Sequence, residues 1–505
     1  MIRIVGLWVI ALLVVFLSAV SARPAGAAQP GAAWSVAERI PDYGDNSAAP
    51  YLVADRYGTV HAVNSQIAGS KVAVVYRRWT LADGWTPPTD ILLPPVGGDA
   101  NVQGLYLDGE GVLHVVFHAG TQAQAGIYYS KAPVSSANSA PVWSAPVLVG
   151  KDASHLAYAI LAGDEGGALI VAYSGVGAGN GLYAVVSMDS GKTWSEPSVV
   201  FLTRDLRRDV SEIRGCVDSR GQLHVVWSVS NQAGNSEAVY YSRLTADRRV
   251  WSNPVVVGEN TGYEADMAAI VEHGNELFVM YHTADDLAVT RWMKRSGDGG
   301  KTWSPRVLPF AQFRGTYGHP VFVHDSSGTL HVVLGNRLPA AQGAAKPDTH
   351  GMWHAVWQKD RWSGLEPIIS GPQVKQGELF DPTDPQAVVV QGNVMLVTWR
   401  TDPGLGGNGA WYSYTTLNAP ALPLLASPTP APTPTIALAA TALPRPTSQT
   451  AHASLPAPSP ERQTPSIAEP MPSQDPTGWL IFGIAPAVVL VSVVVAGRLI
   501  SGRRR

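Results

Sequence analysis

Apolar residues in the middle of the chain come in short runs that alternate with polar residues, the period-two pattern of half-buried β-strands. A Gly followed by an apolar strand recurs seven times, at 58–63, 111–116, 167–172, 221–226, 274–280, 328–333 and 392–397. The steps between equivalent strand positions are 53, 56, 54, 54, 53 and 64 residues. Those equivalent positions are His61, His114, Ile170, His224, Phe278, His331 and Met395. A period near fifty suits a propeller blade of four strands, so the sequence predicts an all-β, seven-bladed β-propeller over residues 34–418.

Each copy also predicts how its blade is built and how the ring closes. A third, aromatic strand is followed by a fourth that we expect to begin at a Trp-Ser-x-Pro motif, as at Trp143, Trp194 and Trp251. Pro near the start of a strand fits the outer edge of a sheet, where a backbone donor can be lost. The seventh copy lacks this motif, whereas residues 34–40 begin with the same Trp-Ser pair. We therefore expect the N-terminal strand to complete the last blade. The four histidines among the equivalent positions indicate a packing site between blades and not a metal cluster.

The two ends of the chain predict where the protein resides. Residues 1–22 have the charged start, apolar stretch and small-residue cleavage site of a signal peptide, with an uncleaved anchor as the alternative. Residues 419–478 are rich in Pro, Ala, Ser and Thr and predict an extended, disordered stalk. Residues 479–500 are long and apolar enough for a transmembrane helix, and the Arg-rich tail 501–505 predicts a cytoplasmic end. We expect a single-pass protein of the cell membrane with its propeller outside the cell.

Charge and cysteine content exclude several classes of function. The formal net charge is −3, so bulk electrostatics attracts no nucleic acid. The single cysteine, Cys216, excludes an internal disulfide framework and a cysteine-based zinc site. No motif requires a cofactor or a metal, and we expect neither.

Two turns carry a motif that points to a family. Residues 187–194 and 296–303 both fit Ser-x-Asp-x-Gly-x-Thr-Trp, and both precede a predicted fourth strand. This motif resembles the Asp box of sialidase-superfamily (BNR-repeat) propellers, which implies a structural turn on the face away from the active site. The implied structural residues are Asp189, Gly191, Trp194, Asp298, Gly300 and Trp303. The family domain has six blades, so this chain resembles a seven-bladed variant.

The resemblance implies an arginine clamp for a carboxylate, a Tyr nucleophile activated by a Glu, and an Asp acid/base. Arg39-Ile40-Pro41 matches a family arginine motif, but it falls on the predicted closing strand, so we assign Arg39 no clamp role. In a four-stranded blade, the loop before the first strand and the turn after the second meet on one face. The candidate substrate-binding residues on that face are Arg214, Arg337, Arg400, His282 and Tyr263. The candidate catalytic residues are Tyr317, Glu212 and Asp381.

Three functions remain open on the sequence alone. The first is a surface-anchored, sialidase-like propeller that binds or processes extracellular glycans or glycoproteins, with exo-sialidase-type hydrolysis as its possible chemistry. The second is a non-catalytic module that displays a protein- or glycan-binding site. The third is a polysaccharide lyase on a BNR propeller, in which a pair such as His319 and Tyr317 acts as base and acid. The sequence decides neither between binding and catalysis nor the oligomeric state.

Overall fold

The computed structural model describes one part of the chain, the part around the predicted propeller. The described residues are 33–44, 47–121, 124–155, 158–164, 166–205, 207–231, 235–260, 264–285, 288–311, 318–336, 351–370, 382–401 and 409–426. The predicted signal peptide, the stalk beyond residue 426, the predicted membrane span and the tail lie outside them. Within the described ranges, no helix is long and apolar enough to cross a membrane.

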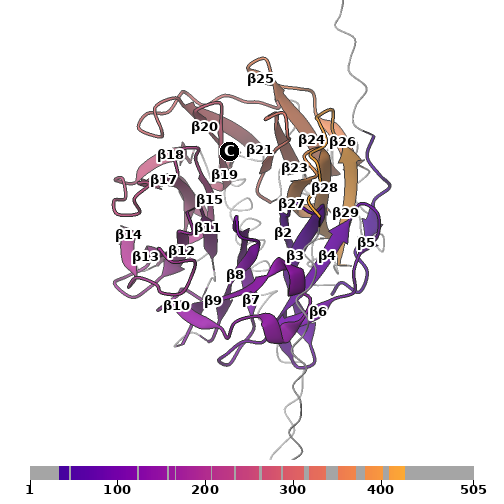
Figure 1. The fold of residues 1–505 in the computed structure, drawn as a ribbon. Coiled ribbons are helices and arrows are strands. Elements are labelled where there is room, and N and C mark those ends of the chain that lie inside the picture. Colours follow the sequence, from indigo (N-terminus) through magenta and orange to yellow (C-terminus); the bar gives the residue numbers. More distant parts are fainter. Residues whose placement is uncertain are drawn as a thin grey trace, which may run out of the picture. The chain divides into compact units, whose positions relative to one another are not determined.

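The described strands form seven antiparallel sheets that stand as blades around a central axis (Figure 1). Blade 1 holds β2 (Tyr51–Ala54), β3 (Thr59–Ala68), β4 (Lys71–Thr80), β5 (Gly84–Trp85) and β6 (Thr89–Leu92). Blade 2 holds β7 (Asn101–Leu107), β8 (Val112–Ala119), β9 (Gly126–Pro133) and β10 (Val147–Gly150), with the short 3-10 turns Val134–Ser136 and Ala140–Val142 after β9. Blade 3 holds β11 (Ala159–Gly163), β12 (Leu169–Gly175), β13 (Gly181–Ser187) and β14 (Ser198–Leu202). Blade 4 holds β15 (Arg208–Val217), β16 (Leu223–Asn231), β17 (Ser236–Leu244) and β18 (Val255–Glu259).

The remaining three blades complete the ring, and the prediction of seven blades is confirmed. Blade 5 holds β19 (Glu264–His273), β20 (Glu276–Asp285) and β21 (Ala288–Ser296). Blade 6 holds β22 (Val321–His324), β23 (Leu330–Asn336), β24 (Gly351–Gln358), β25 (Arg361–Trp362) and β26 (Glu366–Ser370). Blade 7 holds β27 (Pro382–Val390), β28 (Val394–Thr401), β29 (Ala410–Thr416) and β1 (Glu38–Arg39). The first strands of neighbouring blades contact one another around the axis.

The ring is closed by its N-terminal segment, as the sequence predicts. Strand β1 runs antiparallel to β29 and is the outermost strand of blade 7. The backbone N–H of Ser35 donates to the carbonyl of Tyr414, and that of Ile40 donates to Ala410, both over 2.8 Å. The Ile40 side chain is completely buried against Tyr43 and Ala410. Segments far apart in the sequence thus share one sheet and one small core.

The outer strands begin later than the Trp-Ser motifs predict. Strand β10 starts at Val147 and not at Trp143, although the N–H of Ser144 already donates to the carbonyl of Lys131 on β9. Pro146 follows and has no N–H to give, so regular pairing resumes only after it. Blade 5 shows the extreme case, because its outer strand is reduced to a bridge between Met293 and Val307.

One turn recurs between the first and second strand of every blade. Its Gly has a positive φ in all seven copies, between 57° and 87°, which favours Gly over other residues. In blade 1, Asp55 accepts the N–H groups of Tyr57 and Thr59, and its other oxygen lies 3.1 Å from Nε2 of His61. The Nδ1 of His61 lies 2.7 Å from the Tyr76 hydroxyl. Asp108–His114–Tyr129, Asp218–His224–Tyr241 and Asp325–His331–His354 repeat the arrangement. The recurring histidines are therefore buried packing residues.

The Asp-box turns lie at the same end of the blades as the Gly turns, and each contacts the adjacent blade. Asp189 lies between β13 and β14, where one carboxylate oxygen accepts the N–H groups of Lys192 and Thr193. The Trp194 ring packs edge-on against Tyr129 of blade 2, with ring centroids 5.1 Å apart. In the second box, Trp303 packs on Tyr241 of blade 4 in the same way. Each box therefore anchors its turn on the blade before it.

The last described residues lie across three of the Gly turns. We call residues 420–425 the strap. Ser326 Oγ of blade 6 donates to the carbonyl of Pro420, the N–H of Leu422 donates to Gln391 of blade 7, and the N–H of Leu425 donates to Arg56 of blade 1. The strap thus spans the blades on both sides of the closing sheet, at the end of the first strands where the Gly turns lie.

Candidate functional site

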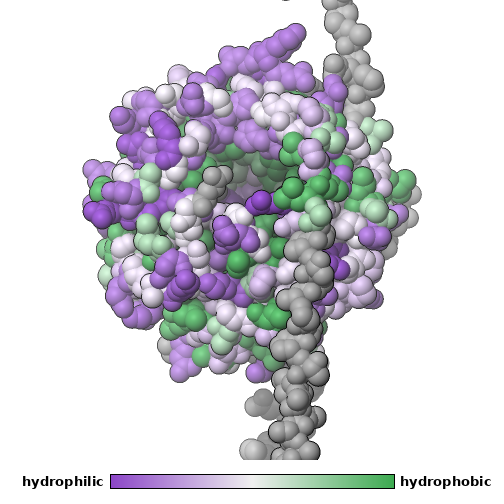
Figure 2. Space-filling model, in the orientation of Figure 1, coloured by the Kyte–Doolittle hydropathy of each residue, from purple (hydrophilic) through white to green (hydrophobic). Residues whose placement is uncertain are grey.

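A cavity of about 590 Å³ lies on the axis, at the opposite end of the first strands from the strap. Its walls come from all seven blades. The space-filling view in Figure 2 shows one face of the ring, where hydrophilic and hydrophobic residues are interspersed. The chemically active side chains among its walls are Tyr51, Gln103, Tyr158, Glu212, Arg214, His319, Asp384 and Arg400. This size and this mixture of charged, aromatic and small residues suit a polar small-molecule ligand.

Three cavity residues owe their positions to the same backbone irregularity. The pairing of β15, β19 and β27 with their neighbours is interrupted by one extra residue, after Ser211, Asp266 and Thr383 respectively. The first extra residues are Glu212, Met267 and Asp384, with φ angles of 53°, 47° and 48°. A β-bulge re-aims a side chain, and positive φ at a non-Gly residue is a strained state found at functional sites. The repeated bulge therefore brings Glu212 and Asp384 to the cavity wall.

The two arginines of the cavity differ in their partners. The Nε of Arg400 on β28 donates to Oδ2 of Asp384 over 2.7 Å, which gives a partly buried ion pair. The guanidinium of Arg214 on β15 donates to the carbonyl of Ile213. Among the described residues, no carboxylate lies within ion-pairing distance of Arg214. One guanidinium is thus available for an anion, while the other holds a carboxylate in place.

Glu212 and His319 form a pair that is poised near neutral pH. His319 Nδ1 lies 2.8 Å from the carbonyl of Ala268, to which it donates, so the other ring nitrogen is left as an acceptor. That Nε2 lies 3.5 Å from a carboxylate oxygen of Glu212. Burial raises the pKa of Glu212 to about 7, and the Asp266 charge adds to this rise. Burial, with the Arg214 charge, lowers the pKa of His319 well below its ordinary value. A neutral imidazole therefore faces a carboxyl group that holds or gives up its proton near pH 7.

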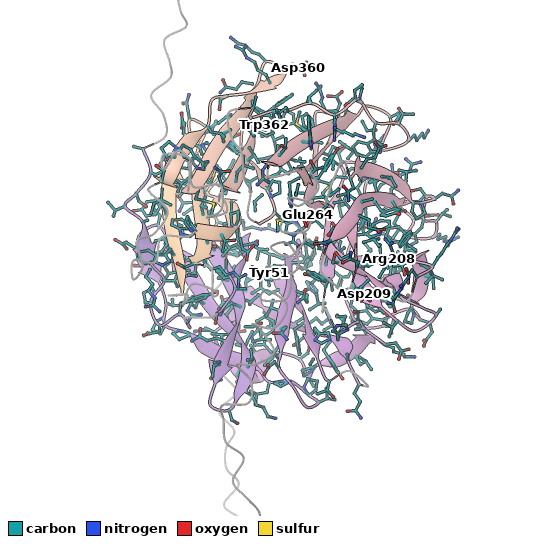
Figure 3. All side chains as sticks on the ribbon, turned by 180° about the vertical axis from the view of Figure 1, so that it is seen from behind. Tyr51, Arg208, Asp209, Glu264, Asp360 and Trp362 are labelled. Atoms are coloured by element: carbon teal, nitrogen blue, oxygen red, sulfur yellow. The ribbon has the colours of Figure 1, made fainter. Side chains whose placement is uncertain are left out.

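Two tyrosines face the same charges. Burial raises the pKa of Tyr158 to about 12, with the charge of Glu212 next in importance and that of Arg214 opposing it. Burial also raises the pKa of Tyr51, in the fields of Arg214 and Asp384. Seen from behind in Figure 3, Tyr51 lies near the middle of the ring, whereas Asp360 and Trp362 lie at its rim. Both phenols are therefore protonated hydrogen-bond donors at neutral pH.

A second charged group lies on blade 5, next to the cavity wall. Ligand atoms of Glu264, Asp266 and His282 come within 4.8 Å of one another, which is the donor chemistry of a cation site. The imidazole, however, lies between the two carboxylates, with Nδ1 2.6 Å from Asp266 and Nε2 3.5 Å from Glu264. Burial alone would lower the pKa of His282, but these carboxylates overcome it and raise the pKa to about 9. The three side chains thus form one mostly buried charged group beside the cavity wall.

The structure unites some of the predicted site residues and leaves others aside. Glu212, Arg214 and Arg400 line the one cavity. His282 is 3% exposed and is not among the cavity-lining residues. Tyr317, Asp381, Arg337 and Tyr263 lie outside the described residues. Sequence reasoning passed over Tyr51 and Tyr158, which precede or begin first strands and could have been found by that position. Asp384 reaches the cavity wall through a β-bulge, and no residue type in the sequence indicates that bulge.

Comparisons with known proteins assign the chain to no family. No protein-family model and no curated protein matches the chain. Among solved structures, a protein of unknown function from Dyadobacter fermentans is 16% identical, with a TM-score of 0.48 over 77% of this chain and 100% of that one. A polysaccharide lyase acting on ulvan is 11% identical, with a TM-score of 0.49 over 76% and 97%. A leech intramolecular trans-sialidase is 13% identical, with a TM-score of 0.40 over 74% and 68%.

Proposed function

We propose that the central cavity binds an acidic saccharide and that the propeller acts on extracellular glycans. The observation that carries the proposal is the meeting of Arg214 and Arg400 with Glu212, His319 and Asp384 in one cavity. Saccharides carry many hydroxyl groups, and the carboxylates and phenols of the cavity can accept hydrogen bonds from them and donate hydrogen bonds to them. Its volume of about 590 Å³ lies in the range of small-ligand sites and leaves room for a short saccharide.

The charge arrangement favours a ligand with an acidic group. Arg400 is already occupied by Asp384, whereas Arg214 reaches the cavity without a carboxylate partner among the described residues. A partly buried guanidinium gains most from a carboxylate or sulfate that can accept two of its N–H groups. Asp384, held by Arg400, is then free to accept a sugar hydroxyl with its other oxygen.

The test is binding of defined sugars to the full-length protein in detergent. Calorimetry with oligosaccharides that end in glucuronate or sialate is compared with neutral oligosaccharides of equal length. We expect the acidic sugars to bind more tightly and Arg214→Ala to remove the preference. Equal affinity for the acidic and neutral sugars would refute the proposal.

Cleavage of the bound glycan is the second candidate, and the Glu212–His319 pair favours it. A carboxyl group with a pKa of about 7, beside a neutral imidazole, can take up and deliver a proton at physiological pH. This pair would serve as proton donor and acceptor in hydrolysis or in lyase chemistry, with Tyr158 beside it. Product release from a labelled acidic oligosaccharide, lost in Glu212→Gln while binding persists, distinguishes an enzyme from a binding module.

Display at the cell surface remains part of the proposal. It is supported by the sequence of the two ends and by the strap, which lies on the face opposite the cavity. A stalk that leaves from there would keep the cavity mouth clear. Protease treatment of intact cells tests this: release of the propeller into the medium supports display, and its retention inside the cell contradicts it.

A further inference from the structure

Three metal-ligating side chains of blade 5 share one face of its sheet. Glu264 and Asp266 stand two residues apart on β19, so their side chains leave the strand on the same side. His282 on β20 is paired across the sheet with Asp266 and lies diagonally opposite Glu264, which pairs with Ala284. One ring nitrogen and one oxygen of each carboxylate lie within 4.8 Å of one another. The strand register therefore brings these three groups together.

Asp266 and His282 hold two buried polar atoms that lack a hydrogen-bond partner. Their side chains are only 8% and 3% exposed. The hydroxyl of Ser236 on blade 4 donates to Oδ2 of Asp266 over 3.3 Å, and Oδ1 is the oxygen that faces the imidazole. Oδ1 and the Nδ1 of His282 lie 2.6 Å apart, yet neither forms a hydrogen bond within the described part of the chain. Buried polar atoms are almost always satisfied, and a cation that contacts both atoms satisfies both.

The charge of the cluster also favours a divalent cation. Glu264 and Asp266 bring two negative charges, of which a proton on His282 compensates one. A divalent ion on a neutral imidazole compensates both. Arg291 on β21 is the cross-strand partner of His282 and carries a charge that opposes the ion. Its guanidinium, however, donates to the carbonyl of Gly335 on blade 6, so it is anchored on the neighbouring blade.

The donor set selects zinc among the common divalent ions. Zn²⁺ accepts an imidazole nitrogen together with carboxylate oxygens, whereas Ca²⁺ takes about six to eight oxygen ligands. Two ligands of a tetrahedral Zn²⁺ lie about 3.3 Å apart. The 2.6 Å between Nδ1 and Oδ1 and the 4.8 Å limit for all three atoms bracket this value. Glu264 lies on the Nε2 side of the ring, 3.5 Å away, so its carboxylate has to turn towards Nδ1 to complete the site.

The cluster is accessible from the central cavity. Glu264 is its most exposed member, with 27% of the side chain accessible, and it lies near the middle of the ring in Figure 3. Asp266 immediately precedes Met267, which lines the cavity and whose N–H donates to Oε2 of Glu212 over 2.9 Å. An ion can therefore enter past Glu264, and once bound it lies next to the cavity wall.

We propose that Glu264, Asp266 and His282 form a Zn²⁺ site on blade 5. Asp266 Oδ1 and His282 Nδ1 are its buried ligands, and Glu264 is the partly exposed third ligand. Three protein ligands leave a fourth position for water or another small ligand. The ion ties β19 to β20 beside the bulge at Met267 and adds positive charge next to the cavity. The proposal goes beyond the proposed function and does not depend on it, because metal binding needs no saccharide.

The experiment measures Zn²⁺ binding to the full-length protein in detergent. The protein is stripped with a chelator, dialysed, and titrated with Zn²⁺ in competition with a chromophoric chelator. We expect one tightly bound ion per chain, weakened at least about 100-fold in His282→Gln and in Asp266→Asn and about 10-fold in Glu264→Gln. X-ray absorption of the loaded wild type should show one imidazole and oxygen ligands at about 2.0–2.2 Å. Glu264→Gln, which changes a partly exposed side chain, decides the matter if the two buried variants do not fold.

Two other histidine sites serve as controls. The Nδ1 of His273 and the Nε2 of His324 lie 3.3 Å apart in an exposed pair that could take up Zn²⁺ adventitiously. His118 on blade 2 is a buried histidine with Asn101 opposite it instead of a carboxylate. His324→Gln and His118→Gln should both leave the tight binding unchanged. The proposal is overturned if the wild type binds no Zn²⁺, if binding survives in the cluster variants or is lost only in His324→Gln, or if Ca²⁺ is bound in preference to Zn²⁺.

Discussion

Arg400 donates from Nε to Oδ2 of Asp384 over 2.7 Å, so this guanidinium reaches the cavity already paired. Arg214 reaches the same cavity with only the carbonyl of Ile213 as its hydrogen-bond partner among the described residues. The two arginines are therefore not equivalent. In the proposed function, Arg214 recognises the anionic group of the ligand, whereas Arg400 holds the Asp384 carboxylate.

Arg214→Ala should weaken the binding of an acidic oligosaccharide by about 10- to 100-fold, the worth of a hydrogen bond between charged groups. Affinity for a neutral oligosaccharide of the same length should change much less. Arg207→Ala is the matched control, because Arg207 is 79% exposed and pairs with Asp205 in a surface loop. Calorimetry on the three proteins checks the prediction, and an equal loss in both arginine variants would contradict it.

The contributions of Glu212 and His282 to the stability of the protein should fall as the pH rises from about 5 to 9. Folding raises the pKa of Glu212 from 4.5 to about 7 and that of His282 from 6.5 to about 9. At these two groups the folded protein therefore binds more protons than the unfolded chain, so their contribution to the free energy of unfolding decreases with pH. Buried histidines with a lowered pKa, such as His118 and His319, contribute in the opposite direction below about pH 6.5. The Glu212 contribution is complete below about 4.5 and lost as pH rises through about 7. The His282 contribution is complete below about 6.5 and lost as pH rises through about 9.

Urea unfolding of the wild type and of His282→Gln at several pH values isolates the His282 contribution, because the other titrating groups are common to the two proteins. The variant should be less stable than the wild type at pH 6, and the difference should shrink towards pH 10. A raised pKa in a buried residue corresponds to a change on the order of a few kcal/mol over the interval. Parallel pH profiles for the two proteins would show that His282 does not carry the effect.

The blade count and the ring closure could be predicted because they depend on features that repeat. Each blade needs a turn with positive φ, and Gly is the residue that adopts it without strain. The number of these glycines, seven at near-constant spacing, therefore gives the number of blades. The Trp34-Ser35 pair at the N-terminus matches the motif missing from the last copy, so the closing strand follows from the repeat as well.

The cavity could be predicted only in part, because its key residues break the repeat. Glu212 was predicted as a site residue, but the bulges with positive φ that bring Glu212 and Asp384 to the wall could not be predicted, because their residue types do not favour that conformation. His118 and His282 each lie four residues after an equivalent strand position, His114 and Phe278, yet their cross-strand partners differ, Asn101 in one blade and Asp266 in the other. Such differences depend on which residues pair across strands and how deeply they are buried, and a single sequence does not give the strand register.

The Asp-box turn should tolerate no side chain at Gly191. A Cβ placed there would lie 2.1 Å from the hydroxyl oxygen of Tyr129, and its φ of +77° disfavours any other residue. Gly191→Ala should therefore lower the free energy of unfolding by about 2 kcal/mol or more, through strain and displacement of Tyr129. Gly69→Ala is the control: its φ is +65°, but no described atom lies within 4 Å of the added carbon, so only about 1 kcal/mol of backbone strain is expected. Urea unfolding of both variants measures the difference, and equal losses would argue against the contact with Tyr129.

The closing segment should contribute to stability through one buried side chain. Ile40 is completely buried against Tyr43 and Ala410, whereas Val36, four residues earlier on the same segment, is 82% exposed. Ile40→Ala should lower the free energy of unfolding by about 2–4 kcal/mol, because it removes apolar contacts and leaves a cavity beside β29. Val36→Ala should change it by less than about 0.5 kcal/mol, as surface substitutions do. Urea unfolding of the two variants against the wild type measures both. An unchanged stability for Ile40→Ala would mean that the ring holds together without its N-terminal strand.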